Sequence, residues 1–138
     1  TPANLRRKAY EDVMKEYERL PITYEVSPQK SRQEVISKLF DEHPEVDGIF
    51  ASDDLIAAAV ITESRIRGKS IPTQLKVVGY DGTDTVKTIL PELTTIQQPI
   101  DSIAEVAIDI LSKEIEGEFD NIQLETYLPV KLLEGGTT

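Results

Sequence analysis

Short polar side chains follow three apolar runs of the sequence, at the residues where those runs end. Residues 52–54 (Ser-Asp-Asp) follow the run GIFA, Asp81 follows LKVVGY, and residues 97–98 (Gln-Gln) follow LTTI. If each run is a parallel strand of an open α/β sheet, these groups meet at one edge, because ligands of such sheets bind outside the carboxyl ends of the strands. A carboxylate can accept hydrogen bonds from two neighbouring hydroxyl groups. The pattern therefore predicts a rim suited to a ligand rich in hydroxyl groups.

Arg6 is a candidate for the same rim. It lies near the start of the first predicted helix, at the end of the fold where the rim is expected, and a guanidinium donates to two oxygens at once. Composition alone favours a surface arginine instead. Tyr80, next to Asp81, is expected in the core rather than as a platform on which a ligand stacks.

The rim residues also have purely structural explanations. At least one of Asp53 and Asp54 is expected to cap the helix that follows and to favour its dipole, and Ser52 could serve as the cap as well. Asp81 stands before Gly82 and fits the chemistry of a turn. Successive strand residues face opposite sides, so only one of the two glutamines at 97 and 98 can meet a ligand.

Residue counts exclude several classes of chemistry. The 138 residues contain no cysteine and one histidine, so thiolate sites are excluded, and a triad or a histidine metal site could form only around His43. That residue precedes a proline and fits the end of a helix. We expect no enzyme activity, no metal and no cofactor. With 15 basic and 25 acidic residues the net charge is −10, so this segment would be repelled by DNA.

Strand-like and helix-like periods alternate along the chain, which predicts an α/β fold with a Rossmann-like parallel sheet flanked by helices. A capping box, Ser31 with Glu34, opens the second helix, and Gly68 suits the end of the third. Residues 135–138 are expected to fray. The predicted helices cover residues 2–20, 31–43, 54–67, 86–90 and 100–117, and the predicted strands cover 22–26, 48–52, 75–80, 93–96 and 124–133.

Five motifs, in order along the chain, resemble those of the lac/gal-repressor family of transcription regulators. Two are DGIFASDDLIA (47–57), similar to the family's strand and Ser/Asn-Asp-x-x-Ala helix, and VVGYDGT (77–83), similar to its VVGFD strand and loop. PELTTIQQP (91–99) and LPVKLL (128–133) resemble its P-x-LTTI-x-Q crossing segment and its LPVxLI closing strand. RRKAY (6–10) looks like its R-x-x-G-[FY] helix start. The resemblance covers nearly the whole chain with the spacings that the family has.

The resemblance implies a sensing domain of two Rossmann-like lobes, with an effector in the cleft between them and a fold shared with periplasmic sugar-binding proteins. Carried over by motif, five residues would bind the ligand. Arg6 would grip the effector, and Ser52 and Asp53 would stand at the edge of the cleft. Asp81 would accept hydroxyl groups of the ligand, and Gln98 would lie near it.

The same resemblance implies how the chain divides. Residues 1–97 and 122–134 would form the C-terminal lobe of a periplasmic-binding-protein-like fold truncated at its N-terminus, and residues 98–121 a crossing segment and a helix that packs on an N-terminal lobe. We expect a missing central strand and an uncovered apolar helix face, filled by self-association or strand exchange. Val26 falls about where some family members place an aromatic ring, which argues against ring stacking from this lobe.

The function implied is ligand sensing by a cytoplasmic, sugar-responsive regulator, with a repressor expected. Its partners would be a sugar or sugar phosphate, operator DNA through a head outside this chain, and a second copy in a homodimer or higher assembly, with no membrane. An alternative is a periplasmic or extracellular sugar-binding protein of a transporter, which shares the fold, although the crossing and closing motifs favour the regulator. A third possibility is a Mg²⁺-binding phosphoacceptor domain built on Asp53, Asp54 and Asp81. It would need a lysine after a later strand, where this chain has Gln-Gln-Pro.

Overall fold

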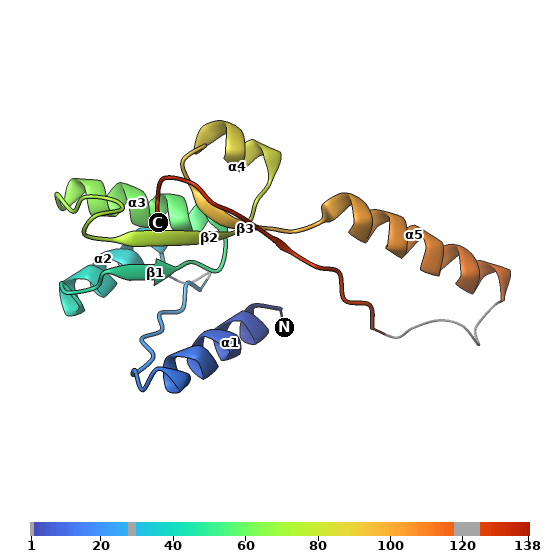
Figure 1. The fold of residues 1–138 in the computed structure, drawn as a ribbon, viewed down its shortest axis with the longest axis horizontal. Helices are drawn as coiled ribbons and strands as arrows, with labels where there is room; N and C mark the ends of the chain where they lie inside the picture. The colour runs from blue at the N-terminus through green and yellow to red at the C-terminus, as the bar shows by residue number, and fades with distance from the viewer. Residues whose placement is uncertain (1, 28–29, 118–124) are drawn as a thin grey trace.

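The alternation of helix and strand periods produces one four-stranded sheet with helices around it (Figure 1). The computed structural model describes residues 2–27, 30–117 and 125–138. Strand β2 pairs in parallel with β1 and with β3, and β4 pairs antiparallel to β3. The predicted α/β class is thereby confirmed. The elements are α1 (Pro2–Glu16), α2 (Arg32–Glu42), β1 (Gly48–Phe50), α3 (Asp54–Ile66), β2 (Lys76–Asp81), α4 (Asp84–Ile89), β3 (Thr94–Gln97), α5 (Ile100–Glu116) and β4 (Lys131–Leu133).

The hydrophobic core lies between the sheet and the helices α2 and α3, which pack on each other. Helix α2 begins, and helix α3 ends, as the sequence predicts. Ser31 and Glu34 form a reciprocal capping box at the start of α2, and Gly68 has a positive φ of 72° just beyond α3. The four strands with α2 and α3 are called the body below. Its buried apolar side chains are Val35, Ile36, Phe40, Ala51, Ala57, Val60, Ile61, Leu75, Val77 and Leu93.

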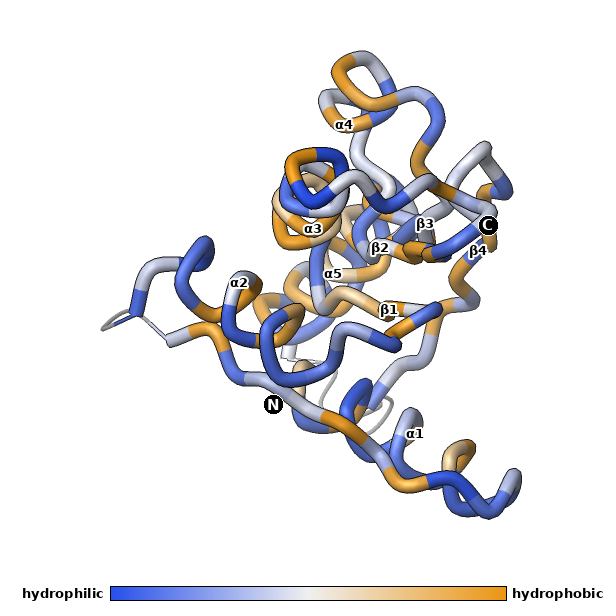
Figure 2. Tube along the Cα trace, turned by 90° about the vertical axis from the view of Figure 1, so that its left-hand side faces the viewer, coloured by the Kyte–Doolittle hydropathy of each residue, from blue (hydrophilic) through white to orange (hydrophobic). Residues whose placement is uncertain are grey.

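Helices α1 and α5 lie apart from the body. Neither contains a buried residue. In Figure 1, α5 extends away from the sheet, and Figure 2 shows α1 lying below β1 and α2. No helix in the described part of the chain is long and apolar enough to cross a membrane. The large apolar side chains exposed on α5 are Ile100, Ile103, Ile108, Leu111 and Ile115.

Three of the predicted elements differ in the structure. Residues 22–26 form extended chain but no strand, because a strand needs a neighbour for its N–H and C=O groups and β1 pairs, among the described residues, with β2 only. Helix α1 ends at Glu16 rather than near residue 20, and Glu18 has a positive φ of 54° that a continuing helix cannot accommodate. Of the predicted strand over 124–133, the structure has Lys131–Leu133, and Leu124 lies outside the described residues.

The prediction that residues 135–138 fray is wrong. Thr137 is 1% exposed, and its Oγ1 donates to Val77 O at 2.7 Å and accepts from Thr94 N at 2.9 Å. Val77 N in turn donates to Thr137 O at 2.8 Å. The tail therefore fills the notch between the starts of β2 and β3, because its hydroxyl and carbonyl satisfy backbone groups that the sheet leaves open there.

Candidate functional site

Asp81 and Gln98 are joined at the carboxyl ends of β2 and β3. Gln98 Nε2 donates to Asp81 Oδ1 at 2.7 Å, and Gln98 N donates to Asp81 O at 3.0 Å. Asp81 has a φ of 122°, a value that residues with a side chain rarely adopt. The two side chains therefore hold each other at the rim where the sequence places them, in a conformation that the surrounding structure must enforce.

Arg6 reaches the same rim from α1. Its Cζ lies 4.2 Å from the centroid of the Tyr80 ring, within the range of a cation–π contact. Among the described residues, Arg6 Nε is the one buried side-chain nitrogen or oxygen without a hydrogen-bond partner. Buried donors are almost always satisfied in folded proteins, so this N–H still needs an acceptor. The expectation that Tyr80 belongs to the core is wrong, because its ring is half-buried and carries the guanidinium of α1.

Ser52 and Asp53 lie between β1 and α3. Asp53 caps α3, since its Oδ1 accepts from Ile56 N at 2.8 Å, which confirms the structural role expected of one of the two aspartates. Ser52 is exposed and is not the cap. Asp53 is half-buried, and one carboxylate oxygen is thus occupied by the helix.

Asp54 has a role that the sequence did not reveal. It is 2% exposed, its Oδ2 accepts from Gly82 N at 2.8 Å, and its Oδ1 accepts from Thr95 Oγ1 at 2.5 Å. The sequence suggested a helix cap or a magnesium ligand. No local pattern in the sequence indicates this role; in the structure, a Cβ at Gly79 would collide with Asp54 Oδ1. Asp54 thus ties the start of α3 to the loop after Asp81 and to β3.

The structure therefore gathers three of the five predicted ligand-binding residues, Arg6, Asp81 and Gln98, around the end of β2. Ser52 and Asp53 stand at the start of α3, which Asp54 links to the same loop. The set consists of hydrogen-bond donors and acceptors without a nucleophile and base in contact, so its chemistry is that of holding a polar ligand. In residues 2–27, 30–117 and 125–138 no group of three or more acidic or histidine side chains is placed to hold a metal ion.

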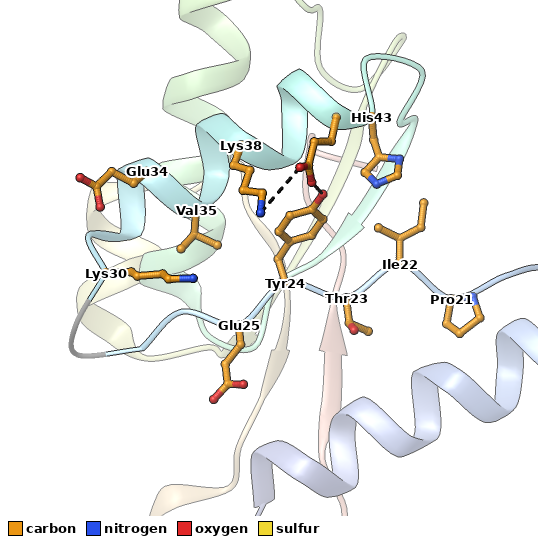
Figure 3. A pocket seen from close by; sticks show the side chains of 11 residues that line it. Pro21, Ile22, Thr23, Tyr24, Glu25, Lys30, Glu34, Val35, Lys38 and His43 are labelled. Atoms are coloured by element: carbon orange, nitrogen blue, oxygen red, sulfur yellow. Dashed lines mark hydrogen bonds and ion pairs between the residues drawn. The ribbon is translucent and has the colours of Figure 1, made fainter.

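A hollow of about 730 Å³ lies elsewhere, between residues 21–25 and α2 (Figure 3). The hydroxyl group of Tyr24 donates to Glu42, and Lys38 Nζ lies 3.6 Å from Glu42 Oε1. The bond to the carboxylate raises the pKa of Tyr24 to about 12, and the Tyr24 hydroxyl lowers the pKa of Glu42 below its usual value. The side chains of Tyr24, Lys38 and Glu42 thus satisfy one another. None of the five predicted ligand-binding residues lines this hollow.

The chain is similar along nearly its whole length to parts of known sugar-operon repressors. A sequence profile for the periplasmic binding protein-like domain matches residues 1–138. The chain is 36% identical to the ribose operon repressor of Halalkalibacterium halodurans, over 100% of this chain and 42% of that protein. It is 35% identical to the sucrose operon repressor of Pediococcus pentosaceus, over 99% of this chain and 43% of that protein. It therefore spans less than half the length of these curated relatives.

Among solved structures, the chain resembles a LacI family transcriptional regulator from Arthrobacter sp. FB24, determined in complex with lactose. The TM-score is 0.77 at 25% identity, over 95% of this chain and 49% of that one. The chain belongs to the periplasmic binding protein-like domain family, in the form found in lac/gal-type repressors, as its five motifs predicted.

Proposed function

We propose that the chain is one lobe of the effector-binding domain of a sugar-responsive transcriptional repressor. The effector, a sugar or sugar phosphate, binds at the rim where Arg6, Asp81 and Gln98 meet. The observation that carries the proposal is the buried N–H of Arg6 Nε, which has no partner among the described residues, on a guanidinium that contacts the ring of Tyr80, the neighbour of Asp81. Donors and acceptors side by side suit hydroxyl groups, which both donate and accept hydrogen bonds.

In this proposal the protein is cytoplasmic and has no catalytic activity. The effector fills the cleft between this lobe and a second one and favours one arrangement of the two, which changes the affinity of the whole protein for operator DNA. The apolar face of α5 is where the second lobe packs, because it exposes large apolar side chains: Ile100, Ile103, Ile108, Leu111 and Ile115. Residues 1–97 and 122–134 then form this lobe, and residues 98–121 are a crossing segment and a helix that packs on the second lobe.

A homodimer is also part of the proposal. Large apolar side chains are exposed on α3 and α4 as well as on α5, among them Leu55, Ile66 and Ile89. Large apolar side chains exposed on more than one helix are typical of a surface that a partner covers. The transporter alternative is not favoured, because the relatives at 36% and 35% identity are operon repressors.

The experiment is a thermal-shift screen of the full-length protein with ribose, sucrose, lactose and their phosphorylated forms. A ligand that binds the folded state raises the midpoint of unfolding, and Asp81→Asn should abolish most of that shift. Asp84→Ala is the matched control, because Asp84 is an acid three residues further on whose side chain is almost fully exposed. A sugar whose shift survives Asp81→Asn would move the site elsewhere. A screen in which no sugar shifts the midpoint would contradict the proposed class of effector.

A further inference from the structure

Asp54 is a carboxylate buried almost completely at the first residue of α3. A buried charge is costly unless hydrogen bonds or opposite charges compensate it. Asp54 forms no ion pair within the described parts of the chain, so its compensation comes from the N–H of Gly82, the hydroxyl of Thr95 and the start of a helix. The role of Asp54 therefore lies in the two groups that its carboxylate oxygens bind.

One oxygen holds the loop that presents Asp81. Asp54 Oδ2 accepts from the N–H of Gly82, the residue that follows Asp81. Asp81 has a φ of 122°, a backbone conformation that needs outside support, whereas the φ of 62° at Gly82 is one that glycine adopts without strain. A side chain at position 82 is excluded, since a Cβ there would lie 2.6 Å from Gln97 Cα. Asp54 thus supports this turn from the side of α3, while Gln98 supports it from the side of β3.

The other oxygen, Asp54 Oδ1, is fixed by two strand residues. Thr95, 2% exposed on β3, donates its hydroxyl to Asp54 Oδ1 at 2.5 Å. Gly79 on β2 lacks the Cβ that would collide with the same oxygen. Three elements therefore converge on one carboxylate, which fixes its orientation toward Gly82.

We propose that Asp54 is a positioning residue for effector binding. Its carboxylate anchors Gly82 N–H, and through this anchor it keeps the carboxylate of Asp81 at the rim beside Gln98, without touching the ligand itself. The inference rests on the proposed function, because it assigns Asp54 to the same site. It extends that function from the residues that meet the ligand to the buried residue that sets their geometry.

The first test needs no ligand. In the full chain, ¹⁵N NMR compares Asp54→Leu, which keeps the branched shape but removes both acceptors, with Asp54→Asn, which keeps one acceptor for Gly82 and can donate to Thr95. In Asp54→Leu we expect the Gly82 amide to exchange at least about tenfold faster and the side-chain amide signals of Gln98 to shift. Asp54→Asn should restore most of both signals, a rescue that burial alone would not produce.

A matched control separates positioning from general loss of stability. Glu63 is the other buried acid on α3 and bonds to Arg67 and Gln33, away from the rim. Glu63→Gln should leave the Gly82 and Gln98 signals unchanged. If Asp54→Leu fails to fold, Thr95→Val loosens only one oxygen of the carboxylate and should move the same signals less, in the same direction. Unchanged signals in a folded Asp54→Leu or Thr95→Val variant overturn the proposal.

The second test is a double-mutant cycle measured with ribose, sucrose and lactose by calorimetry. Asp54→Leu should weaken binding about tenfold, and it should have no further effect in a protein that already carries Asp81→Asn, because residues that act through one contact are not additive. Additive losses would overturn the positioning role. If no sugar binds the wild-type protein, the proposed function fails, while the NMR comparison still decides whether Asp54 positions Asp81.

Discussion

Helices α3 and α5 look alike in sequence and behave differently in the structure. Both carry an apolar stripe at helical spacing, yet Ala57, Val60 and Ile61 of α3 are at most 2% exposed, whereas α5 contains no buried residue. The difference is what lies opposite each stripe: α3 packs on β2, and no described segment covers α5. Periodicity predicts a helix and the face that it will bury, but it does not identify the surface on which that face packs.

The candidate site lies at the boundary between these two kinds of region. Asp81 and Gln98 belong to the body and are held by bonds within it, whereas Arg6 comes from α1, which has no buried residue. The contact of Arg6 with the Tyr80 ring joins the two. The body thus supplies a preformed set of acceptors, and an outlying helix supplies the charged donor.

Hydrogen exchange should show the largest contrast between the two regions. Opening the core helix α3 requires global unfolding, on the order of 5 kcal/mol or more, whereas α5 can open locally, so its amides should exchange at least about a thousandfold faster. Mass spectrometry of peptic fragments measures this ratio. Similar protection in both helices would mean that another copy of the chain covers α5, and that protection should then fall on dilution.

A pair of isoleucines gives the next largest effect. Ile61→Ala in α3 removes a side chain that is 1% exposed and should lower the free energy of unfolding by about 2–5 kcal/mol. Ile108→Ala in α5 removes the same atoms from a side chain that is 65% exposed and should change it by less than about 0.5 kcal/mol. Urea titrations of both variants measure the difference. Equal losses would contradict the division into body and outlying helix.

Two adjacent residues near the end of the chain, Thr137 and Thr138, allow a further comparison. Thr137→Val leaves Val77 O and Thr94 N without their partner, which should destabilise the chain by roughly 3 kcal/mol, since each buried group left unpaired costs about 1–3 kcal/mol. Thr138→Val, at an exposed position, loses one bond to the Thr94 hydroxyl and should cost less than about 1 kcal/mol. The midpoints of urea unfolding compare the two. If Thr137→Val were as mild as Thr138→Val, the tail would not be part of the core.

The smallest effect is expected where residues 21–27 meet the body, at Tyr24 and Glu42. The lowered pKa of Glu42 means that the contact stabilises the fold above the usual pKa of glutamate and is lost as the pH falls through the lowered value. The raised pKa of Tyr24 means that it stabilises below pH 10.0 and is lost as the pH rises toward about 12. The difference in unfolding free energy between wild type and Tyr24→Phe should therefore be largest, and constant, between these two pH limits. Tyr17→Phe, at an exposed position, should leave the curve unchanged, and a parallel shift of the Tyr24→Phe curve at every pH would refute the coupling.

Local rules predicted much of this molecule. Caps, breakers and periodicity located α2, α3, β2 and α5, and the position after each strand located Asp81 and Gln98, because these signals depend only on neighbours in sequence. The predictions that failed concern residues whose structure depends on partners far away in the sequence. Residues 22–26 alternate like a strand but lack a neighbour, and Thr137 resembles a loose end but meets Val77 across 60 residues. The pairing of Asp54 with Gly82 and Thr95 is equally invisible to a reading of local pattern.

The distance along the chain between Val77 and Thr137 also bears on how the protein is made. Val77, at the start of β2, is synthesised 60 residues before Thr137, the partner of its backbone groups. Until then a nascent chain has α2, α3 and the first strands available for collapse, with an open notch in the sheet. Contacts between residues so far apart form late, because closing a long loop must precede them. Until residue 137 has been synthesised, the nascent chain is therefore exposed to chaperones and to pairing with foreign strands.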